Sequence, residues 1–361
     1  MRPRQSTIRD VARAAGVSPA TVSRFLNKTL ILPTATAEQI ERACEALAYR
    51  PNRLAQRLST GSSGLIGLAT PEIANPFFAS LAAAAEDEAR SLGYSLLITS
   101  TNGDPDLESA NIDRLDSRDV DGLIVLTNRV DDGRICRRIT GRRDVVLVDE
   151  DVPGADVARI FVENEQGAYQ ATRLLIEAGH RRIAHVGGPR DLFSAGERFK
   201  GFAAALMEAG VTLDPSLVRS GEYHRASGLE AIRSLMSGSQ GRPSAVFAGS
   251  DYIALGILQG LNEMGLQSPR DLSIVSFDDM PFAELLHPPL TTVRQPIEQM
   301  GRLGVGALLA QLRGDQAVGV ARLPTALIVR GSVTEAPRRS RKTTRGGVVP
   351  DEEALPRVSG P

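Results

Sequence analysis

The sequence predicts an α/β protein, with a small all-α head at the N-terminus and a larger core of doubly wound parallel sheets in two lobes. Two observations predict this fold. Residues 7–27 read as two short amphipathic helices joined by a tight turn, which is a helix-turn-helix pattern. From residue 65 onward, short apolar runs alternate with amphipathic helices, as in parallel sheets with helices on both faces.

The first pattern is the stretch TIRDVARAAGVSPATVSRFLN. Apolar residues recur at helical spacing on both sides of Gly16, which can adopt the left-handed conformation that a turn needs. Ser18 is a natural N-cap, and Pro19 suits the first helical position because no amide hydrogen is needed there. The spacing alone fits an ordinary helical hairpin equally well.

Charge distribution favours the helix-turn-helix. Residues 1–60 hold ten Lys/Arg and four Asp/Glu, a net charge of +6, whereas the whole chain carries −1 and the other 301 residues carry −7. Such asymmetry indicates a polyanion-binding head on an acidic body.

A third helix is expected at 36–48, and the sequence YRPN ends it because the residue before a proline avoids the helical region. A short helical segment follows at 53–59, and then a Gly/Ser linker to residue 64. A helix this short is marginal in water, so the segment reads either as a frayed linker or as a helix that forms on a partner.

Alternating strands and helices fill the core. Strands are expected at 65–70, 94–100, 122–127, 144–149, 159–163, 182–188, 218–223, 244–250 and 272–277. Helices are expected near 77–92, 105–118, 131–140, 165–178, 195–209, 226–236 and 251–264. Nine or more strands divide most naturally into two lobes. Residues 337–361 are rich in Pro, Gly and charge and are expected to be disordered.

Composition excludes several classes of protein. Aromatic residues make up 4% of the chain and Trp is absent, which disfavours a stacking platform for single-stranded nucleic acid. Cys44 and Cys136 are far apart, and His180 and His185 read as structural residues, so neither a disulfide nor a metal site is expected. No signal peptide or membrane-spanning run is visible, so we expect a cytoplasmic, nucleoid-associated protein.

Enzyme motifs are missing as well. The sequence has no P-loop, no H-E-x-x-H and no G-x-S-x-G, and its Gly pairs lack the full dinucleotide fingerprint. No catalytic residue and no cofactor are therefore expected.

A series of motifs resembles the LacI/GalR family of bacterial transcription regulators from about residue 6 to residue 333. They occur in the family's order as the stretch above, YRPNRLAQRLSTG, IGLATPEIANPFF, DGLIVL, NEQGAYQATRLLIEAGHRRIAHVGGP, ERFKGFAAALMEAG, SAVFAGSDYIALG, SIVSFDD and PPLTTVRQP. The resemblance implies a DNA-binding domain at 1–50, a hinge helix and linker at 51–64, and a core at 65–336 like that of periplasmic sugar-binding proteins. Residues 337–361 form the tail.

The resemblance implies DNA contacts in the head and the hinge, at Thr7, Ser18, Pro19, Ala20, Thr21, Ser23, Arg24, Asn27, Asn52, Ala55 and Leu58. Short polar side chains suit phosphates, whereas Arg24 is the side chain of the recognition helix, residues 19–26, that can make a bidentate contact with guanine. In the hinge helix that the resemblance implies, Leu58 stands at the position of an apolar side chain that inserts into the minor groove. Ala55 stands where the hinge helices of the two subunits pack close together.

An effector cleft is expected between the lobes, at the carboxyl ends of the strands. The family's pattern assigns to it Pro71, Asn75, Phe77, Asp149, Arg198, Tyr223, Ser250, Asp278 and Gln295. Carboxylates and a guanidinium suit paired hydroxyls, and aromatic faces suit the C–H side of a sugar ring. Most relatives have Asn where this chain has Ser250, so the usual hydroxyl clamp lacks one amide.

We therefore predict a ligand-responsive repressor that binds a near-palindromic operator as a homodimer and responds to a sugar or sugar phosphate. A dimer is expected because the tail lacks leucine heptads. Alternatives are a regulator of the same fold that senses a nucleoside or purine, one that needs a co-repressor, and a secreted sugar-binding protein. The last would need a signal peptide in place of the basic head.

Overall fold

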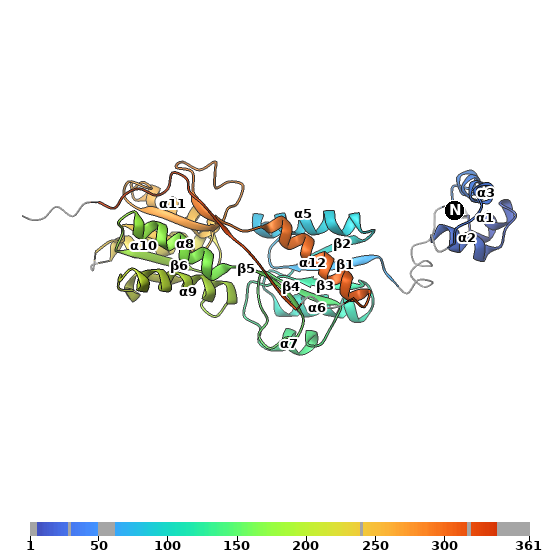
Figure 1. The fold of residues 1–361 in the computed structure, drawn as a ribbon, viewed down its shortest axis with the longest axis horizontal. Coiled ribbons are helices and arrows are strands. Elements are labelled where there is room, and N and C mark those ends of the chain that lie inside the picture. Colours follow the sequence, from blue (N-terminus) through green and yellow to red (C-terminus); the bar gives the residue numbers. More distant parts are fainter. Residues whose placement is uncertain (1–5, 28–29, 50–61, 239–240, 316–318, 338–361) are drawn as a thin grey trace, which may run out of the picture.

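The computed structural model describes residues 6–27, 30–49, 62–238, 241–315 and 319–337. Figure 1 shows a small helical head and a larger α/β core with two lobes, each built on its own sheet. The predicted fold class is confirmed. The described helices include none that is long and apolar enough to cross a membrane.

Three helices form the head, namely α1 (Ile8–Ala14), α2 (Pro19–Leu26) and α3 (Thr34–Ala46). Val11, Val22 and Ile40 are fully buried at their junction, one residue from each helix. Gly16 has a φ of +65° in the turn between α1 and α2, as its position predicts. The third helix begins two residues earlier than expected.

The first lobe has a six-stranded parallel sheet in the order β11-β5-β4-β3-β1-β2. Its strands are β1 (Leu65–Thr70), β2 (Ser95–Ser100), β3 (Gly122–Val125), β4 (Val145–Val148), β5 (Ala158–Val162) and β11 (Val320–Leu323). Its helices are α5 (Pro76–Ser91), α6 (Pro105–Asp116), α7 (Arg134–Ile139) and α12 (Ile297–Leu312). One apolar core lies between the sheet and α5 with α12, and another lies on the face that α6 and α7 cover.

The second lobe has a six-stranded sheet in the order β12-β10-β9-β8-β6-β7. Its strands are β6 (Ile183–Gly187), β7 (Val218–Ser220), β8 (Ala245–Ala248), β9 (Ser273–Asp278), β10 (Thr291–Arg294) and β12 (Ala326–Ile328). Its helices are α8 (Asn164–Glu177), α9 (Phe193–Glu208), α10 (Arg225–Ser237), α11 (Asp251–Glu263) and the 3₁₀ turn η1 (Pro215–Leu217). The edge strand β12 pairs antiparallel with β10, an exception to the parallel pattern.

Within the described residues the chain passes between the lobes after β5, after β10 and between β11 and β12. Four elements beyond residue 277 were not predicted from the sequence, namely β10, α12, β11 and β12. The buried helix α12 returns to the first lobe, where Met300 and Leu308 join the core below α5. Because of these crossings, the carboxyl ends of the strands of both lobes face the space between them.

Candidate functional site

The helix-turn-helix presents one exposed face of α2. Ser18 caps this helix, since its Oγ accepts a hydrogen bond from the Thr21 amide at 3.1 Å. Pro19, Ala20 and Arg24 are exposed, whereas Val22 on the opposite face is fully buried. The residues predicted to read bases therefore lie on the solvent side, as required of a helix that enters the major groove.

The other predicted DNA contacts in the head surround this face. Thr7 is exposed and caps α1 through a reciprocal pair of hydrogen bonds with Asp10. Thr21, Ser23 and Asn27 are half-buried. Their contacts with DNA stay predictions, and the hinge residues Asn52, Ala55 and Leu58 lie outside the described residues.

A carboxylate of the first lobe holds the chain where the core begins. Asp121, directly before β3, accepts hydrogen bonds from Ser62 Oγ at 2.5 Å, the Ser63 amide at 2.6 Å and the Gly64 amide at 2.9 Å. We call these contacts the linker clamp. They fix the point from which the chain leaves the core toward the head.

Eight of the nine predicted effector residues line one cleft between the lobes: Asn75, Phe77, Asp149, Arg198, Tyr223, Ser250, Asp278 and Gln295. The sequence analysis does not name the other lining residues, which are Glu72, Phe78, Asn128, Ser194, His224, Tyr252 and Met280. The cleft residues come from both lobes and lie at or after the carboxyl ends of β1, β3, β4, β6, β7, β8, β9 and β10.

Pro71 is not among the residues that line the cleft, and its place in the effector site stays a prediction. It is buried, and its carbonyl oxygen accepts hydrogen bonds from the Asn102 amide at 2.7 Å and from Ser100 Oγ at 3.2 Å. Pro71 thus ties the end of β1 to the end of β2. Two predicted residues also cap helices in the cleft wall: Asn75 caps α5, and Ser250 caps α11.

Arg198 on α9 is the central cation of the cleft and is 4% exposed. Its Nε donates to Asn164 Oδ1 at 2.8 Å, and its Nη1 donates to the Gly249 carbonyl at 2.6 Å. The guanidinium carbon lies 3.9 Å from the centre of the Phe277 ring, a cation–π contact. These contacts fix the guanidinium in one orientation before any ligand arrives.

Asp278, at the end of β9, lies next to this guanidinium. Its Oδ1 is 3.6 Å from Arg198 Nη1 and accepts a hydrogen bond from Gln295 Nε2 at 2.7 Å. Three buried polar atoms near this pair have no hydrogen-bond partner among the described residues, namely Asp149 Oδ1, Gln295 Oε1 and Asn164 Nδ2. Unsatisfied buried groups are costly, so these atoms are candidates for contacts with a ligand or with water.

Buried carboxyl groups outnumber cations here. Asp149, Glu150 and Asp278 are each less than a tenth exposed, and among the described residues Arg198 is the cation that faces them. Burial raises the pKa of all three carboxyl groups, and for Glu150 the neighbouring Asp149 raises the pKa further. Arg198 opposes this effect only in part. The cleft therefore has no surplus positive charge.

Backbone strain marks the same positions. Asp149 has a φ of +75° and Asp278 a φ of +116°, in the region that disfavours residues other than glycine. Both residues stand at the carboxyl end of a strand, β4 and β9. Strain of this kind persists where the fold holds a side chain in a required direction, and it is common at ligand sites.

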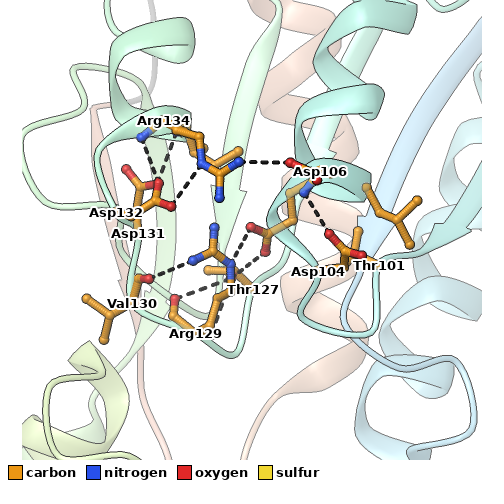
Figure 2. Close-up of polar contacts among 12 residues, drawn as sticks. Thr101, Asp104, Asp106, Thr127, Arg129, Val130, Asp131, Asp132 and Arg134 are labelled. Carbon is orange, nitrogen blue, oxygen red and sulfur yellow. Dashed lines mark hydrogen bonds and ion pairs between the residues drawn. The ribbon is translucent and has the colours of Figure 1, made fainter.

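A charged network supports the first-lobe wall of the cleft (Figure 2). Glu108 on α6 is buried and accepts hydrogen bonds from Arg129 Nε at 2.8 Å and from Thr127 Oγ1 at 2.9 Å. Asn128, between these two residues, lines the cleft. The network fixes the loop after β3. Asp121 of the linker clamp lies directly before the same strand.

Three polar contacts join the lobes around the cleft. Glu150 Oε2 accepts a hydrogen bond from the Ser194 amide at 3.1 Å. His224 Nδ1 lies 3.8 Å from Glu72 Oε2, and both residues line the cleft. Arg322 on β11 donates to both carboxylate oxygens of Glu197 on α9 at 3.0 Å. A movement of the lobes must change these contacts.

The sequence analysis misses the roles of Glu150, Asn164 and Ser194. Glu150 had a usable signal, because it follows Asp149 at the end of a buried strand. Asn164 and Ser194 begin helices and carried no such signal. Asn164 holds Arg198 because the chain crosses between the lobes immediately before it, and Ser194 lines the cleft because α9 points its N-terminus at the first lobe.

Comparisons with known proteins fit both parts of the chain. A model described as bacterial regulatory proteins, lacI family, matches residues 7–52. A model of the periplasmic binding protein-like domain matches residues 172–333.

Relatives match along most of the chain. The transcriptional regulator DegA of Bacillus subtilis is 35% identical over 82% of this chain and 88% of its own length. The ribose operon repressor of Escherichia coli is 34% identical over 85% of this chain and 93% of its own length. The repressor PurR of Erwinia tasmaniensis is 33% identical over 92% of this chain and 98% of its own length.

Solved structures agree. The Lac repressor dimer bound to operator and the anti-inducer ONPF matches with a TM-score of 0.81 and 29% identity over 92% of this chain and all of that one. A complex of the regulator CelR with cellobiose matches with a TM-score of 0.68 and 32% identity over 91% of this chain and 99% of that one.

Proposed function

Because the chain belongs to the lacI family of bacterial regulatory proteins, we propose that a neutral sugar bound in the cleft controls the affinity of the protein for operator DNA. The chain is a DNA-binding transcriptional regulator that responds to a small molecule and binds operator DNA as a dimer. The choice of a sugar, the residues that hold it and a cytoplasmic location are parts of the proposal.

The arrangement of Arg198, Asp278 and Asp149 carries the proposal. A fixed guanidinium and carboxyl oxygens can donate to and accept from paired hydroxyl groups. Phe77 and Tyr223 line the same cleft and offer flat apolar faces to a sugar ring. A phosphate would meet the buried carboxyl groups of Asp149 and Asp278, which line the cleft, so the cleft favours a neutral sugar over a sugar phosphate.

Ligand entry requires movement. The cleft encloses about 40 Å³, whereas small-molecule pockets commonly hold roughly 300–1,000 Å³. The lobes must therefore open, or side chains such as Tyr223 must turn, to admit a sugar. Opening would shift the linker clamp of the first lobe, which is the point from which the chain leads to the head.

A nucleoside is the second candidate. Phe78 and Tyr252 line the cleft with Phe77 and Tyr223, so a flat base could stack there while its ribose meets the carboxyl groups. Relatives named PurR and CytR occur beside the ribose operon repressor.

Calorimetric titration of the full chain would decide between a sugar and a nucleoside as the cleft ligand. The panel consists of ribose, glucose, galactose, cellobiose, glucose 6-phosphate, adenosine and cytidine. We expect saturable binding of a neutral sugar, loss of that binding in Arg198→Met, and no change in Arg270→Met, whose guanidinium pairs with Asp271 on the surface. Binding of the nucleosides alone would favour the second candidate, and binding that survives Arg198→Met would contradict the assignment of the site.

A further inference from the structure

A second cavity lies at the edge of the second lobe, beside the cleft, since Ala195 lines this cavity and the preceding residue Ser194 lines the cleft. It is bounded by β6, by the edge strand β7, by α9 and by the loop at residues 213–215. Its volume is about 290 Å³, close to the lower end of the range of roughly 300–1,000 Å³ for small-molecule pockets. We call it the edge pocket.

Glycine keeps this space open. Gly196, in the first turns of α9, lines the edge pocket, and a Cβ atom added there would meet no atom within 4 Å. Glycine destabilises a helix relative to alanine, so packing gives no reason for it at this position. In contrast, a Cβ at Gly201 of the same helix would lie 2.1 Å from the Glu165 carbonyl oxygen. Close approach of a ligand would account for Gly196.

The walls are mostly apolar and partly aromatic. Phe199, Leu213 and Val218 line the edge pocket, and Leu213 is 36% exposed. The ring of His185 lies in the floor, 3% exposed, and stacks on Phe202 at a centroid distance of 5.0 Å. Burial lowers the pKa of His185 to about 4, so this ring is uncharged at neutral pH.

The charge at the edge pocket is positive. Arg190 is the charged residue at its mouth, and no carboxylate is among the described residues that line it. Arg190 Nε donates to Ser220 Oγ at 3.3 Å, so a guanidinium and a hydroxyl stand side by side at the entrance. Such a pair suits a carboxylate, while the apolar walls suit a flat hydrocarbon body.

We propose that the edge pocket binds a small aromatic carboxylate, with the carboxylate on Arg190 and Ser220 and the ring system between Phe199, Leu213 and Val218. This site is separate from the cleft and does not depend on which ligand the cleft takes. The two sites share α9, because Ser194 and Arg198 on the same helix line the cleft.

The test is calorimetric titration of the full chain with 1-naphthylacetate, with the neutral 1-naphthylacetamide as matched ligand. We expect one saturable site, and binding weaker by about tenfold or more for the amide and for Arg190→Gln, because a charge-assisted hydrogen bond is lost. Arg270→Gln serves as the control for loss of a surface guanidinium and should leave binding unchanged.

Gly196→Leu fills the edge pocket from the helix side and should abolish binding. Its folding is checked by circular dichroism and thermal unfolding, and Arg190→Gln decides the question if this variant does not fold. Absence of saturable binding to the wild-type chain would overturn the proposal. Binding that neither Gly196→Leu nor Arg190→Gln weakens would overturn it too, since the probe would then sit elsewhere.

Discussion

Arg198 Nη1 lies 3.6 Å from Asp278 Oδ1, and both side chains are at least nine-tenths buried. The two residues come from α9 and from the end of β9, so the pair ties the helix to the sheet of the second lobe. The same Asp278 oxygen accepts a hydrogen bond from Gln295, which follows β10. Three distant segments thus converge on one carboxyl oxygen in the cleft.

Removal of this guanidinium should cost stability. Arg198→Met leaves the Gly249 carbonyl and Asn164 Oδ1 without their buried donor, and it removes the cation beside Asp278. We expect the free energy of unfolding in urea to fall by about 3 kcal/mol, as for other broken buried pairs. Arg270→Met removes an exposed guanidinium and should change it by less than about 1 kcal/mol. Equal effects of the two variants would mean that Arg198 is not a structural centre of the cleft.

The buried Glu150 should make stability depend on pH. Burial and the neighbouring Asp149 raise the pKa of Glu150 in the folded chain above the ordinary value of about 4.3. Between the ordinary pKa and the raised pKa, the folded chain holds a proton on Glu150 that the unfolded chain has lost. The free energy of unfolding therefore falls as the pH rises through this window.

Glu150→Gln keeps an acceptor for the Ser194 amide and removes the titration. Urea unfolding between pH 5 and pH 8, which lies between the ordinary pKa of about 4.3 and the raised pKa of about 8 for Glu150, should show a shallower decline for this variant. The slopes should differ by up to about 1.4 kcal/mol per pH unit. Parallel profiles would show that Glu150 is ionised in the folded chain.

Arg24 should read a base. It is exposed on α2, and it can make a bidentate contact with guanine. Arg24→Ala should lower operator affinity by about 1–3 kcal/mol and change affinity for a scrambled duplex much less, as measured by fluorescence anisotropy at fixed salt. If affinity for both duplexes fell equally, Arg24 would be a phosphate contact instead.

The linker clamp should connect the core with the head. Asp121→Ala removes the acceptor for Ser62, Ser63 and Gly64. We expect sugar binding to stay unchanged while operator affinity falls by about tenfold, because the heads lose their fixed points of exit. Asp119→Ala, at an exposed position two residues earlier, is the matched control. Unchanged operator affinity in Asp121→Ala would assign the clamp to core stability alone.

Two glycines of α9 should respond in opposite directions. Gly196→Ala places a methyl group in open space and should raise the free energy of unfolding by about 0.4–1 kcal/mol. Gly201→Ala would place a Cβ 2.1 Å from the Glu165 carbonyl oxygen and 2.8 Å from the Tyr169 amide nitrogen, so it should destabilise the chain. Destabilisation by Gly196→Ala would show that packing does require this glycine, and would remove one support for the edge pocket.

Local patterns made much of the fold predictable. Gly16, Ser18 and Pro19 each have a local physical role, and the structure has the predicted turn and N-cap. Central strands such as β3, β4 and β6 were predictable because both faces are buried, which leaves continuous apolar runs. Local patterns carry no information on crossings between lobes, so α12 and the strands around it were missed.

Part of the cleft was predictable from the buried strands as well. Asp149 and Asp278 follow buried strands, where ligand sites form. Arg198 was assigned by resemblance, since a lone arginine on a helix carries no such signal. Pro71 is not among the lining residues, and its carbonyl oxygen accepts hydrogen bonds from Ser100 and Asn102, so its place in the effector site stays a prediction. Asn164 and Ser194 depend on how the lobes meet, which only the three-dimensional fold determines.

The central claim is that the head binds one operator sequence and that the cleft ligand weakens this binding. The most direct test is a fluorescence-anisotropy titration at fixed salt, with duplexes from upstream of the chain's own gene and neighbouring genes and with a scrambled duplex. We predict a preference of about 10³-fold or more for one duplex, which is the usual minimum for specific regulators. That preference should fall when the sugar found by calorimetry is added. Equal affinity for every duplex, with or without the sugar, would contradict the account.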